Sequence, residues 1–287
     1  LEWVLERLTQ RSPDPALRAH LLVALYQVFH LDDLEPYALA DETVEAVKRT
    51  RGVRAAGFVN AVVRRALRER EAWRAALARD APLAVRFSHP DWLVARWIAR
   101  HGPARAAAMM AWDNSRPSVT VRVSRGQGDP AALRARWAAA GAACSPHPAR
   151  PDVCLVLGRG IDPAALPGWG EGVAVVQDAS TLLAVDLVDP KPGERILDAC
   201  AAPGGKLADL ADRAGGAGIT ALDASESRLA RVREKLRRLR VAVDAIVAGD
   251  LTDPAISRVL LRAGAFDCIL VVAPCTNSGV LRRRPDA

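Results

Sequence analysis

The stretch DACAAPGGK, Asp198–Lys206, decides the fold of the carboxyl-terminal part of this 287-residue chain. The residues before it, GERIL (193–197), favour an extended strand. Those after it, LADLADRA (207–214), carry apolar side chains at helical spacing. The stretch is therefore predicted to be a strand-to-helix turn, which is where open α/β sheets bind ligands.

Strands alternate with helices throughout residues 171–287. Strands are predicted in RILDAC (195–200), GITALDA (218–224), AIVAGD (245–250) and FDCILVVAP (266–274), with a helix in SESRLARVREKLRRLR (225–240). This alternation indicates right-handed βαβ crossovers and a parallel sheet. The fold class is α/β, and this domain is predicted to be Rossmann-like.

Two other regions precede this domain. Residues 1–75 carry three amphipathic helical patterns and predict an all-helical bundle; the patterns lie at 16–31, 38–50 and 57–73. Residues 76–170 mix helical and alternating patterns and predict a small α+β connecting module. Its expected helices span 90–102 and 129–142, and its expected strands span 118–125 and 153–158.

Composition excludes several classes of protein. Half of the residues are hydrophobic and a quarter are charged, as in globular proteins. No apolar run reaches the roughly 18–20 residues of a membrane span, and no secretory leader is visible. Five cysteines without framework spacing indicate reduced thiols and a cytoplasmic protein. Cys144, His147 and Cys154 lack a fourth ligand, so no metal site is predicted.

Charge and chain ends add two expectations. The formal net charge of +7 and the pI of about 9.6 suit a polyanionic partner such as RNA. The chain begins at Leu1, has no methionine before Met109, and stops just after APCTNSGVLRRRPDA (273–287). We expect a piece of a longer protein, truncated at both ends; the sequence does not indicate an oligomeric state.

Two common nucleotide motifs do not fit the turn. A phosphate-binding P-loop needs glycine at position 200 and serine or threonine at 207, where the chain has Cys200 and Leu207. A dinucleotide fingerprint needs separated glycines, whereas Gly204 and Gly205 are adjacent. What remains is a turn that lets a ligand approach the backbone closely, with Lys206 beside it.

Two aspartates and one cysteine follow the neighbouring strands. Asp223 and Asp250 end the second and third strands, so both carboxylates are predicted to reach one crevice and to bind a ligand with a ribose and an amine. Alternatively, either aspartate caps the helix after it. Cys275 follows the fourth strand and is a candidate for covalent catalysis, whereas Cys268 inside the strand reads as a buried hydrophobe.

Several motifs together resemble one family: VVQDAS (175–180), LDACAAPGGK (197–206), ALDASESRL (221–229), AGD (248–250) and APCTNSGVLRRRPD (273–286). In this order they look like the S-adenosylmethionine-dependent RNA cytosine-5 methyltransferases of the Fmu/Sun/NSUN group. The branch of that family that acts on bacterial small-subunit (16S) ribosomal RNA carries a NusB-like RNA-binding domain. Residues 25–48 and 57–68 are similar to that domain, and NSRPSVTVRVS (114–124) resembles the connecting module.

The resemblance implies a function and a set of site residues. The implied reaction is methylation of cytosine C5 in ribosomal RNA with S-adenosylmethionine as cofactor. The implied cofactor-binding residues are Cys200, Ala201, Ala202, Pro203, Gly204, Gly205 and Lys206 around the methionine part, Asp223 on the ribose, Asp250 by the adenine, and Arg228 and Val272. Cys275 would assist product release or substitute for the nucleophile.

The chain departs from the family pattern at three points. Val272 stands where the family usually has aspartate, and Leu207 where it has threonine. The family's nucleophilic cysteine lies in a later T-C motif, which residues 1–287 do not contain. We therefore expect little or no methyl transfer by this chain alone. The alternative is a catalytically silent RNA-binding protein with a degenerate cofactor site.

Basic residues gather in three places. Arg282, Arg283 and Arg284 follow the cysteine turn and are expected to contact RNA phosphates, and the helix at 225–240 carries a charged face that is either solvated or RNA-binding. The third group lies on the helical bundle and consists of Arg64, Arg65 and Arg68. It would extend the expected RNA-binding surface, but the bundle could equally bind protein. The apolar stretch CILVV (268–272) is expected to form an unpaired sheet edge.

Overall fold

The computed structural model describes residues 1–31, 35–216, 218–262 and 264–284; the end of the family-like stretch, residues 285–287, lies outside the described residues. The chain divides into two compact units, Leu1–Ser115 and Arg116–Ala287. This division falls inside the module predicted for residues 76–170, and the boundaries near 75 and 170 stay predictions. In the described part of the chain, no helix is long and apolar enough to cross a membrane.

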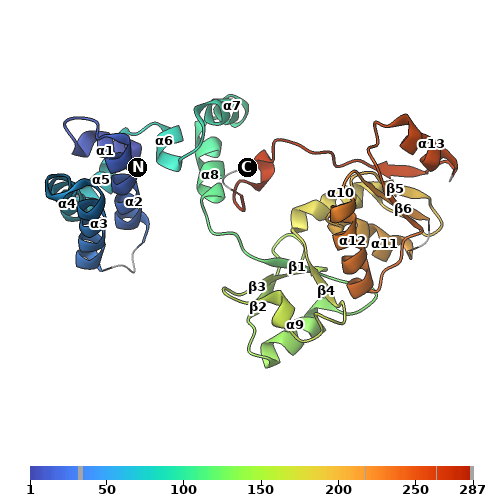
Figure 1. Ribbon diagram of the computed structural model, residues 1–287. Helices are drawn as coiled ribbons and strands as arrows, with labels where there is room; N and C mark the ends of the chain where they lie inside the picture. The colour runs from blue at the N-terminus through green and yellow to red at the C-terminus, as the bar shows by residue number, and fades with distance from the viewer. Residues whose placement is uncertain (32–34, 217, 263, 285–287) are drawn as a thin grey trace. The chain divides into compact units, whose positions relative to one another are not determined.

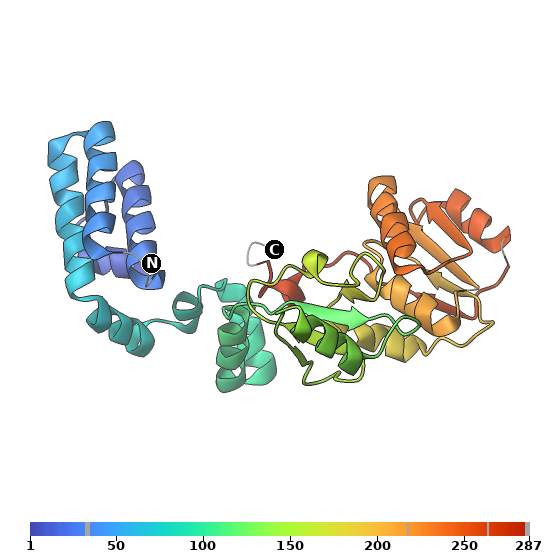
Figure 2. The ribbon, with the colours of Figure 1, turned by 90° about the horizontal axis from the view of Figure 1, so that it is seen from below.

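The first unit is all-helical (Figures 1 and 2). Its helices are α1 (Glu2–Leu8), α2 (Pro15–His30), α3 (Pro36–Arg51), α4 (Val53–Arg68), α5 (Arg70–Asp80), α6 (Leu83–Phe87), α7 (Asp91–His101) and α8 (Pro103–Asp113). The first four share one apolar core in which Leu21, Leu25 and Val59 are fully buried. Helices α6 to α8 form a separate small cluster around Ala106 and Met110. The predicted helical bundle is confirmed.

One predicted helix of the bundle was wrong in length. The pattern at 57–73 was read as a single helix, but the helix ends at Arg68 and a new one begins at Arg70, because Glu69 adopts a non-helical conformation (φ −101°, ψ 15°). The break lets Trp73 and Leu77 of α5 pack against the bundle core. No glycine or proline marks this position, so hydrophobic spacing alone could not reveal it.

The second unit begins with a four-stranded antiparallel sheet of order β2-β3-β1-β4. Its elements are β1 (Thr120–Val123), α9 (Pro130–Ala139), β2 (Cys144–Pro146), β3 (Cys154–Leu157) and β4 (Ala174–Val176). Helix α9 covers the sheet and buries Trp137, whose indole N–H donates to the Pro167 carbonyl at 3.0 Å. The strands predicted near 118–125 and 153–158 are confirmed.

A parallel sheet of order β7-β6-β5-β8 follows in the same unit. Its elements are α10 (Leu182–Val188), β5 (Ile196–Asp198), α11 (Gly205–Ala214), β6 (Ile219–Asp223), α12 (Glu226–Leu239), β7 (Ala245–Ala248), α13 (Pro254–Arg262) and β8 (Cys268–Leu270). All four predicted strands are present and parallel. The chain places β6 and β7 on one side of β5 and then returns to add β8 on the other. Such a reversal of strand order marks where open α/β sheets bind ligands.

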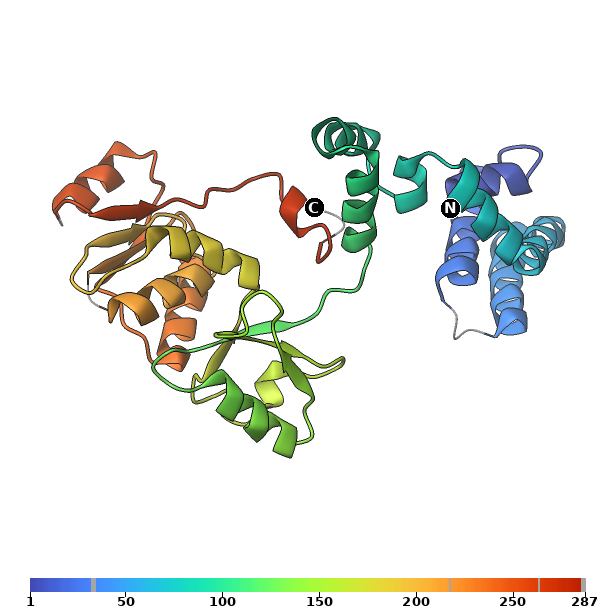
Figure 3. The same cartoon turned by 180° about the vertical axis from the view of Figure 1, so that it is seen from behind.

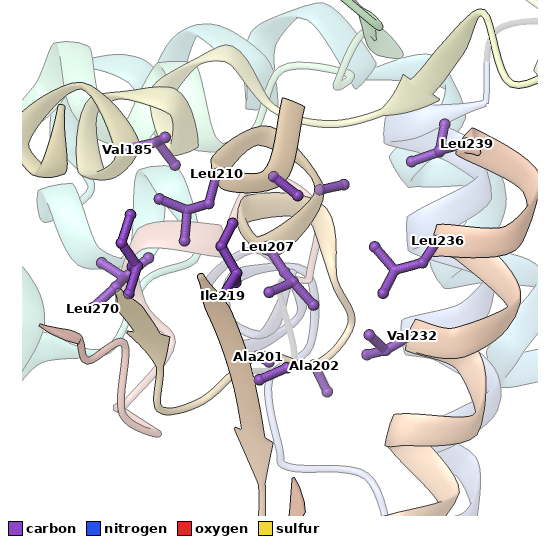
Figure 4. Close-up of a cluster of buried hydrophobic side chains, with 14 of the residues drawn as sticks. Val185, Ala201, Ala202, Leu207, Leu210, Ile219, Val232, Leu236, Leu239 and Leu270 are labelled. Carbon is purple, nitrogen blue, oxygen red and sulfur yellow. The ribbon is translucent and has the colours of Figure 1, made fainter. Parts of the chain in front are cut away.

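The parallel sheet separates two apolar layers. Ile196 joins the core formed with α10, α11 and α12, whereas its neighbour Leu197 joins a smaller cluster with Leu260 of α13. Figure 4 shows the first of these cores, with Leu207 and Leu210 of α11 between Val185 of α10 and Leu236 of α12. Helix α12 buries four apolar side chains, Leu229, Val232, Leu236 and Leu239. Each such burial stabilises the fold by about 1.5–3 kcal/mol. These contacts fix α11 and α12 on the same face, next to the end of β5.

Strand β8 lies at an edge of the parallel sheet in the described part of the chain, as the sequence predicted. Ile269 and Val271 are more than half exposed, at 53% and 54%. An apolar sheet edge of this kind favours association with other chains. That association stays a prediction.

A buried charge network joins the antiparallel sheet of the second unit to helix α11, which follows β5 of the parallel sheet. Arg122 of β1 is 1% exposed, and its Nη1 lies 2.6 Å from Asp212 Oδ2 and 3.6 Å from Asp209 Oδ1 on α11. Its Nε donates to Gln177 Oε1 at 2.9 Å. Asp209 is also bound by Arg213 at 2.9 Å. Because buried charges require partners, this network fixes the antiparallel sheet against the helix that follows the DACAAPGGK turn.

Candidate functional site

The turn between β5 and α11 connects the ends of three strands. Ala199 N donates to Leu270 O of β8 at 2.9 Å, and Ala201 N donates to Leu222 O of β6 at 2.9 Å. Gly204 closes the turn with a left-handed conformation (φ +88°), which side chains other than glycine's rarely adopt. The turn is therefore anchored at the carboxyl edge of the sheet.

Helix α11 presents its first amides at the end of this turn. Amides in the first turn of a helix have no acceptor within the helix, and the helix dipole makes this end favourable for negative charge. Gly205 opens α11 beside Gln177: a Cβ at Gly205 would lie 3.7 Å from the Gln177 side chain. The partly buried Lys206 adds a positive side chain. This end of α11 can therefore receive an anionic group.

Asp223 ends β6 and holds the turn directly. It is 3% exposed, and its Oδ2 accepts the Ala202 N–H at 3.0 Å. Its Oδ1 accepts the Ser225 N–H at 3.1 Å and lies 3.7 Å from Arg228 Nη1. A carboxylate has about four acceptor positions, so both oxygens keep capacity for further donors such as hydroxyl groups.

Asp198, at the end of β5, is the residue that sequence reasoning left out of the site. Its carboxylate is fully buried, and neither oxygen has a hydrogen-bond partner among the described residues. Burial, aided by the nearby charge of Asp223, raises the pKa of Asp198 to about 6; the Cys200 N–H, which lies near the carboxylate without reaching hydrogen-bond geometry, and Lys206 oppose the shift. An unpaired buried carboxylate suits a cationic ligand group. The sequence did carry a signal for Asp198, namely a carboxylate at the end of a predicted strand and directly before the turn.

The raised pKa of Asp198 predicts a pH-dependent stability. In the unfolded chain this carboxyl ionises near its ordinary pKa of 3.8, but in the folded protein only near 6. The contribution of Asp198 to the free energy of unfolding is therefore fully present below about pH 4 and falls by about 3 kcal/mol as the pH rises through 6. Asp198→Asn should remove this loss, so its advantage over the parent chain in urea unfolding should grow from pH 4 to pH 7. An advantage independent of pH would contradict the assignment.

Cys200 and Val272 meet at the rim of the turn. Burial, Asp223 and Asp198 raise the pKa of the Cys200 thiol, while the Val272 N–H bonded to that thiol opposes the shift. The structure thus places Val272, just beyond β8, next to the first residue of the turn. Val272 is 41% exposed, so its side chain is accessible beside the site.

Two predicted site residues, Asp250 and Cys275, make no hydrogen bond within the described part of the structure to the turn or to Asp198 and Asp223. Asp250 is exposed and accepts the N–H and hydroxyl of Thr252 at 2.8 and 2.7 Å, a local turn, whereas the start of the following helix α13 is bound by Asp253 instead. After β8 the chain runs on as an extended segment, drawn in red in Figure 3. Cys275 in this segment is exposed, and its thiol accepts the Asn277 N–H at 3.4 Å. Among the described residues, no side-chain hydrogen bond or ion pair joins Asp250 or Cys275 to the turn.

The three arginines after Cys275 lie differently from one another. Arg282 donates to the Arg116 carbonyl at 2.7 Å, and Arg283 pairs with Asp178 at 2.9 Å. Arg284 is exposed. The segment therefore returns to the residues that flank the antiparallel sheet, and two of the arginines already have partners there.

Three family models match successive parts of the chain. Residues 1–68 match the NusB family, residues 89–162 match the ferredoxin-like domain of RsmF/B-like methyltransferases, and residues 185–287 match 16S rRNA methyltransferase RsmB/F. The last match contains the turn, Asp198 and Asp223.

Relatives extend this similarity over nearly the whole chain. Ribosomal RNA small subunit methyltransferase B of Pseudomonas putida is 38% identical over 96% of this chain, which covers 62% of that protein. The Vibrio cholerae protein of the same name is 36% identical over 93% of this chain and 59% of its own length. The chain thus spans less than two thirds of either relative.

A solved structure shows the same fold. The structure of a methyltransferase homolog protein from Pyrococcus horikoshii matches 70% of this chain and 64% of its own, with a TM-score of 0.59 and 28% identity. Family models, relatives and fold agree with the geometry of the turn: residues 185–287 match the RsmB/F family of 16S rRNA methyltransferases, and nearly the whole chain is similar to proteins named ribosomal RNA small subunit methyltransferase B.

Proposed function

We propose that the second unit binds S-adenosylmethionine at the carboxyl ends of β5 and β6, and that the protein methylates cytosine C5 in small-subunit ribosomal RNA. The observation that carries the proposal is the pair of buried carboxylates, Asp198 and Asp223, on either side of one Gly-Gly turn. Similarity to the RsmB/F family supports the choice of cofactor and of RNA as substrate.

The residues at the turn fit the chemical groups of this cofactor. The unpaired carboxylate of Asp198 suits the ammonium of the methionine part. The amides that open α11 suit its carboxylate. Asp223 retains acceptor positions for ribose hydroxyls. Cys200 to Lys206, Arg228, Val272 and Asp250 complete the proposed binding set, of which Asp250 follows β7 at the same sheet edge.

The chain's own residues hold and orient the ligands. Bound S-adenosylmethionine supplies an electrophilic methyl group. Asp223 fixes the turn through Ala202, so the ligand binds a surface that is already formed. Cys275 is proposed as the thiol that helps release the product, and the target cytosine must be flipped out of its stack to be reached.

Ribosomal RNA is the proposed partner, and the cytoplasm is the proposed location. Arg282, Arg283 and Arg284 are proposed phosphate contacts, with Arg283 exchanging its Asp178 partner for phosphate. The NusB-like domain at residues 1–68 is a second proposed RNA surface. Phosphate contacts of this kind make RNA affinity fall steeply with salt.

Calorimetric titration with S-adenosylhomocysteine tests the proposal. The chain is expected to bind one equivalent, and Val272→Asp is expected to bind more tightly, because it restores the family's carboxylate beside Cys200. Binding about tenfold tighter would correspond to roughly 1.4 kcal/mol. If neither protein binds, the cofactor proposal is wrong and a silent RNA-binding protein becomes the better reading.

A further inference from the structure

We propose that Lys235 is a positioning residue that sets the shape of the cofactor turn by holding the Pro203 carbonyl against α12. The inference rests on the proposed cofactor site and adds a residue to it. Lys235 lies on the helix after β6, outside the family motifs quoted for the site, and nothing in its sequence pattern points to this role.

One face of α12 lies directly on the turn. Arg228, Val232 and Lys235 are spaced i, i+4 and i+7 and therefore share that face. The Lys235 ammonium donates to Pro203 O at 2.5 Å, and Arg228 Nη2 donates to Ala202 O at 3.0 Å. Val232 lies between them: Figure 4 shows its side chain pointing toward the turn at Ala202.

Contact with Val232 brings the turn close to the helix. A Cβ at Gly204 would lie 3.4 Å from a Val232 methyl and 3.6 Å from Lys235 Cδ. The stem of Lys235 thus packs against Gly204 while its ammonium reaches the preceding carbonyl. A lysine that combines an apolar contact and a polar tip in this way is held in one place.

Holding the Pro203 carbonyl fixes the peptide that follows it. The carbonyl and the N–H of one peptide plane point in opposite directions. With Pro203 O turned to α12, the Gly204 N–H turns back and donates to Ala201 O at 2.7 Å. The first helical bond then runs from Ala208 N to Gly204 O at 3.1 Å. The amides of Gly205 and Lys206 are left at the ligand side of the turn.

Lys235 is partly withdrawn from water for this contact. Burial lowers its pKa, with the charges of Arg238 and Arg231 acting in the same direction. A charge-assisted bond to a carbonyl offsets part of that cost. By contrast, Arg231 and Arg237 on the same helix are exposed, so the basic helix is not a uniformly solvated or RNA-facing surface.

The test compares Lys235→Met with Arg231→Met, which makes the same substitution on an exposed position of the same helix. In the ligand-free chain, amide hydrogen exchange at Gly204, whose N–H donates to Ala201 O, should be about tenfold faster in Lys235→Met and unchanged in Arg231→Met. S-adenosylhomocysteine affinity should fall about tenfold in Lys235→Met alone. Lys235→Arg, which keeps a donor, should restore both values, whereas a purely apolar packing role would not predict this rescue.

The outcomes separate this inference from the cofactor proposal. Unchanged exchange at the turn in Lys235→Met, or an equal change in Arg231→Met, overturns the positioning role. Faster exchange in Lys235→Met with no ligand binding by the parent chain supports the positioning role and rejects the cofactor proposal. Thermal unfolding of each variant shows whether a global loss of stability explains the exchange, and such a loss would also overturn the inference.

Discussion

Arg122→Met is expected to lower the free energy of unfolding of the second unit by about 3–5 kcal/mol. The variant leaves Asp212, whose side chain is 8% exposed, without the guanidinium that binds it at 2.6 Å, while the fully buried Asp209 loses Arg122 and keeps only Arg213. An uncompensated buried charge is costly because it cannot be hydrated. Urea unfolding followed by tryptophan fluorescence or circular dichroism measures the loss.

A matched control separates the effect of losing a buried ion pair from the effect of removing one arginine charge. Arg136→Met removes an arginine from the exposed pair with Glu171, whose side chains are 45% and 58% exposed, and should cost less than about 1 kcal/mol. Adding Asp212→Asn to Arg122→Met should recover part of the loss, because one buried charge is removed. Equal effects of Arg122→Met and Arg136→Met would contradict a buried network that joins the antiparallel sheet to α11.

Asp223→Asn is expected to weaken S-adenosylhomocysteine binding about 100-fold. The carboxylate accepts the Ala202 N–H that shapes the turn and, under the proposal, the ribose hydroxyls. Hydrogen bonds to a charged group contribute about 1.5–3 kcal/mol each, and about 2.7 kcal/mol corresponds to 100-fold in affinity. Asparagine has the same shape but presents an amide nitrogen that cannot accept. Isothermal titration calorimetry gives the dissociation constants.

Asp253→Asn serves as the control for this variant. Asp253 caps the start of α13 by accepting the Ala255 N–H at 2.8 Å, and it is exposed. Its replacement should leave ligand affinity within about twofold of the parent value. If Asp223→Asn binds as tightly as Asp253→Asn, Asp223 does not contact the ligand and does not shape its site.

Hydrophobic spacing predicted the elements of the second unit well. The alternation of apolar strands with amphipathic helices gave all four parallel strands, because strands buried on both faces are nearly continuous apolar runs. It also gave α12, whose buried side chains recur at helical spacing. The short elements α6 and β2 were not predicted, since five and three residues carry too little periodicity.

The direction of charged side chains was not available from the sequence. Helix α12 is rich in basic residues, yet three of them, Arg228, Lys235 and Arg238, each donate to a backbone carbonyl. Arg238 also lies over the Trp169 ring at 4.2 Å. These partners come from loops distant in sequence, so only the folded structure brings them together.

The sequence predicted only part of the site, because the path of a loop, like the direction of a side chain, is fixed only in the folded structure. The turn and Asp223 were identified because residues at the ends of adjacent parallel strands must meet. Asp250 and Cys275 also follow strands of this sheet, but the hydrogen bonds that they make are local, to Thr252 and Asn277. Strand position therefore predicted the edge, while loop path decided which residues remain together.

A crystal structure of this chain with S-adenosylhomocysteine tests the central claim most directly. We predict ligand density along Cys200–Lys206, with the amino group within hydrogen-bond distance of Asp198 and the ribose hydroxyls within hydrogen-bond distance of Asp223. Density for the ligand at any other place, with both carboxylates unchanged, would contradict the account.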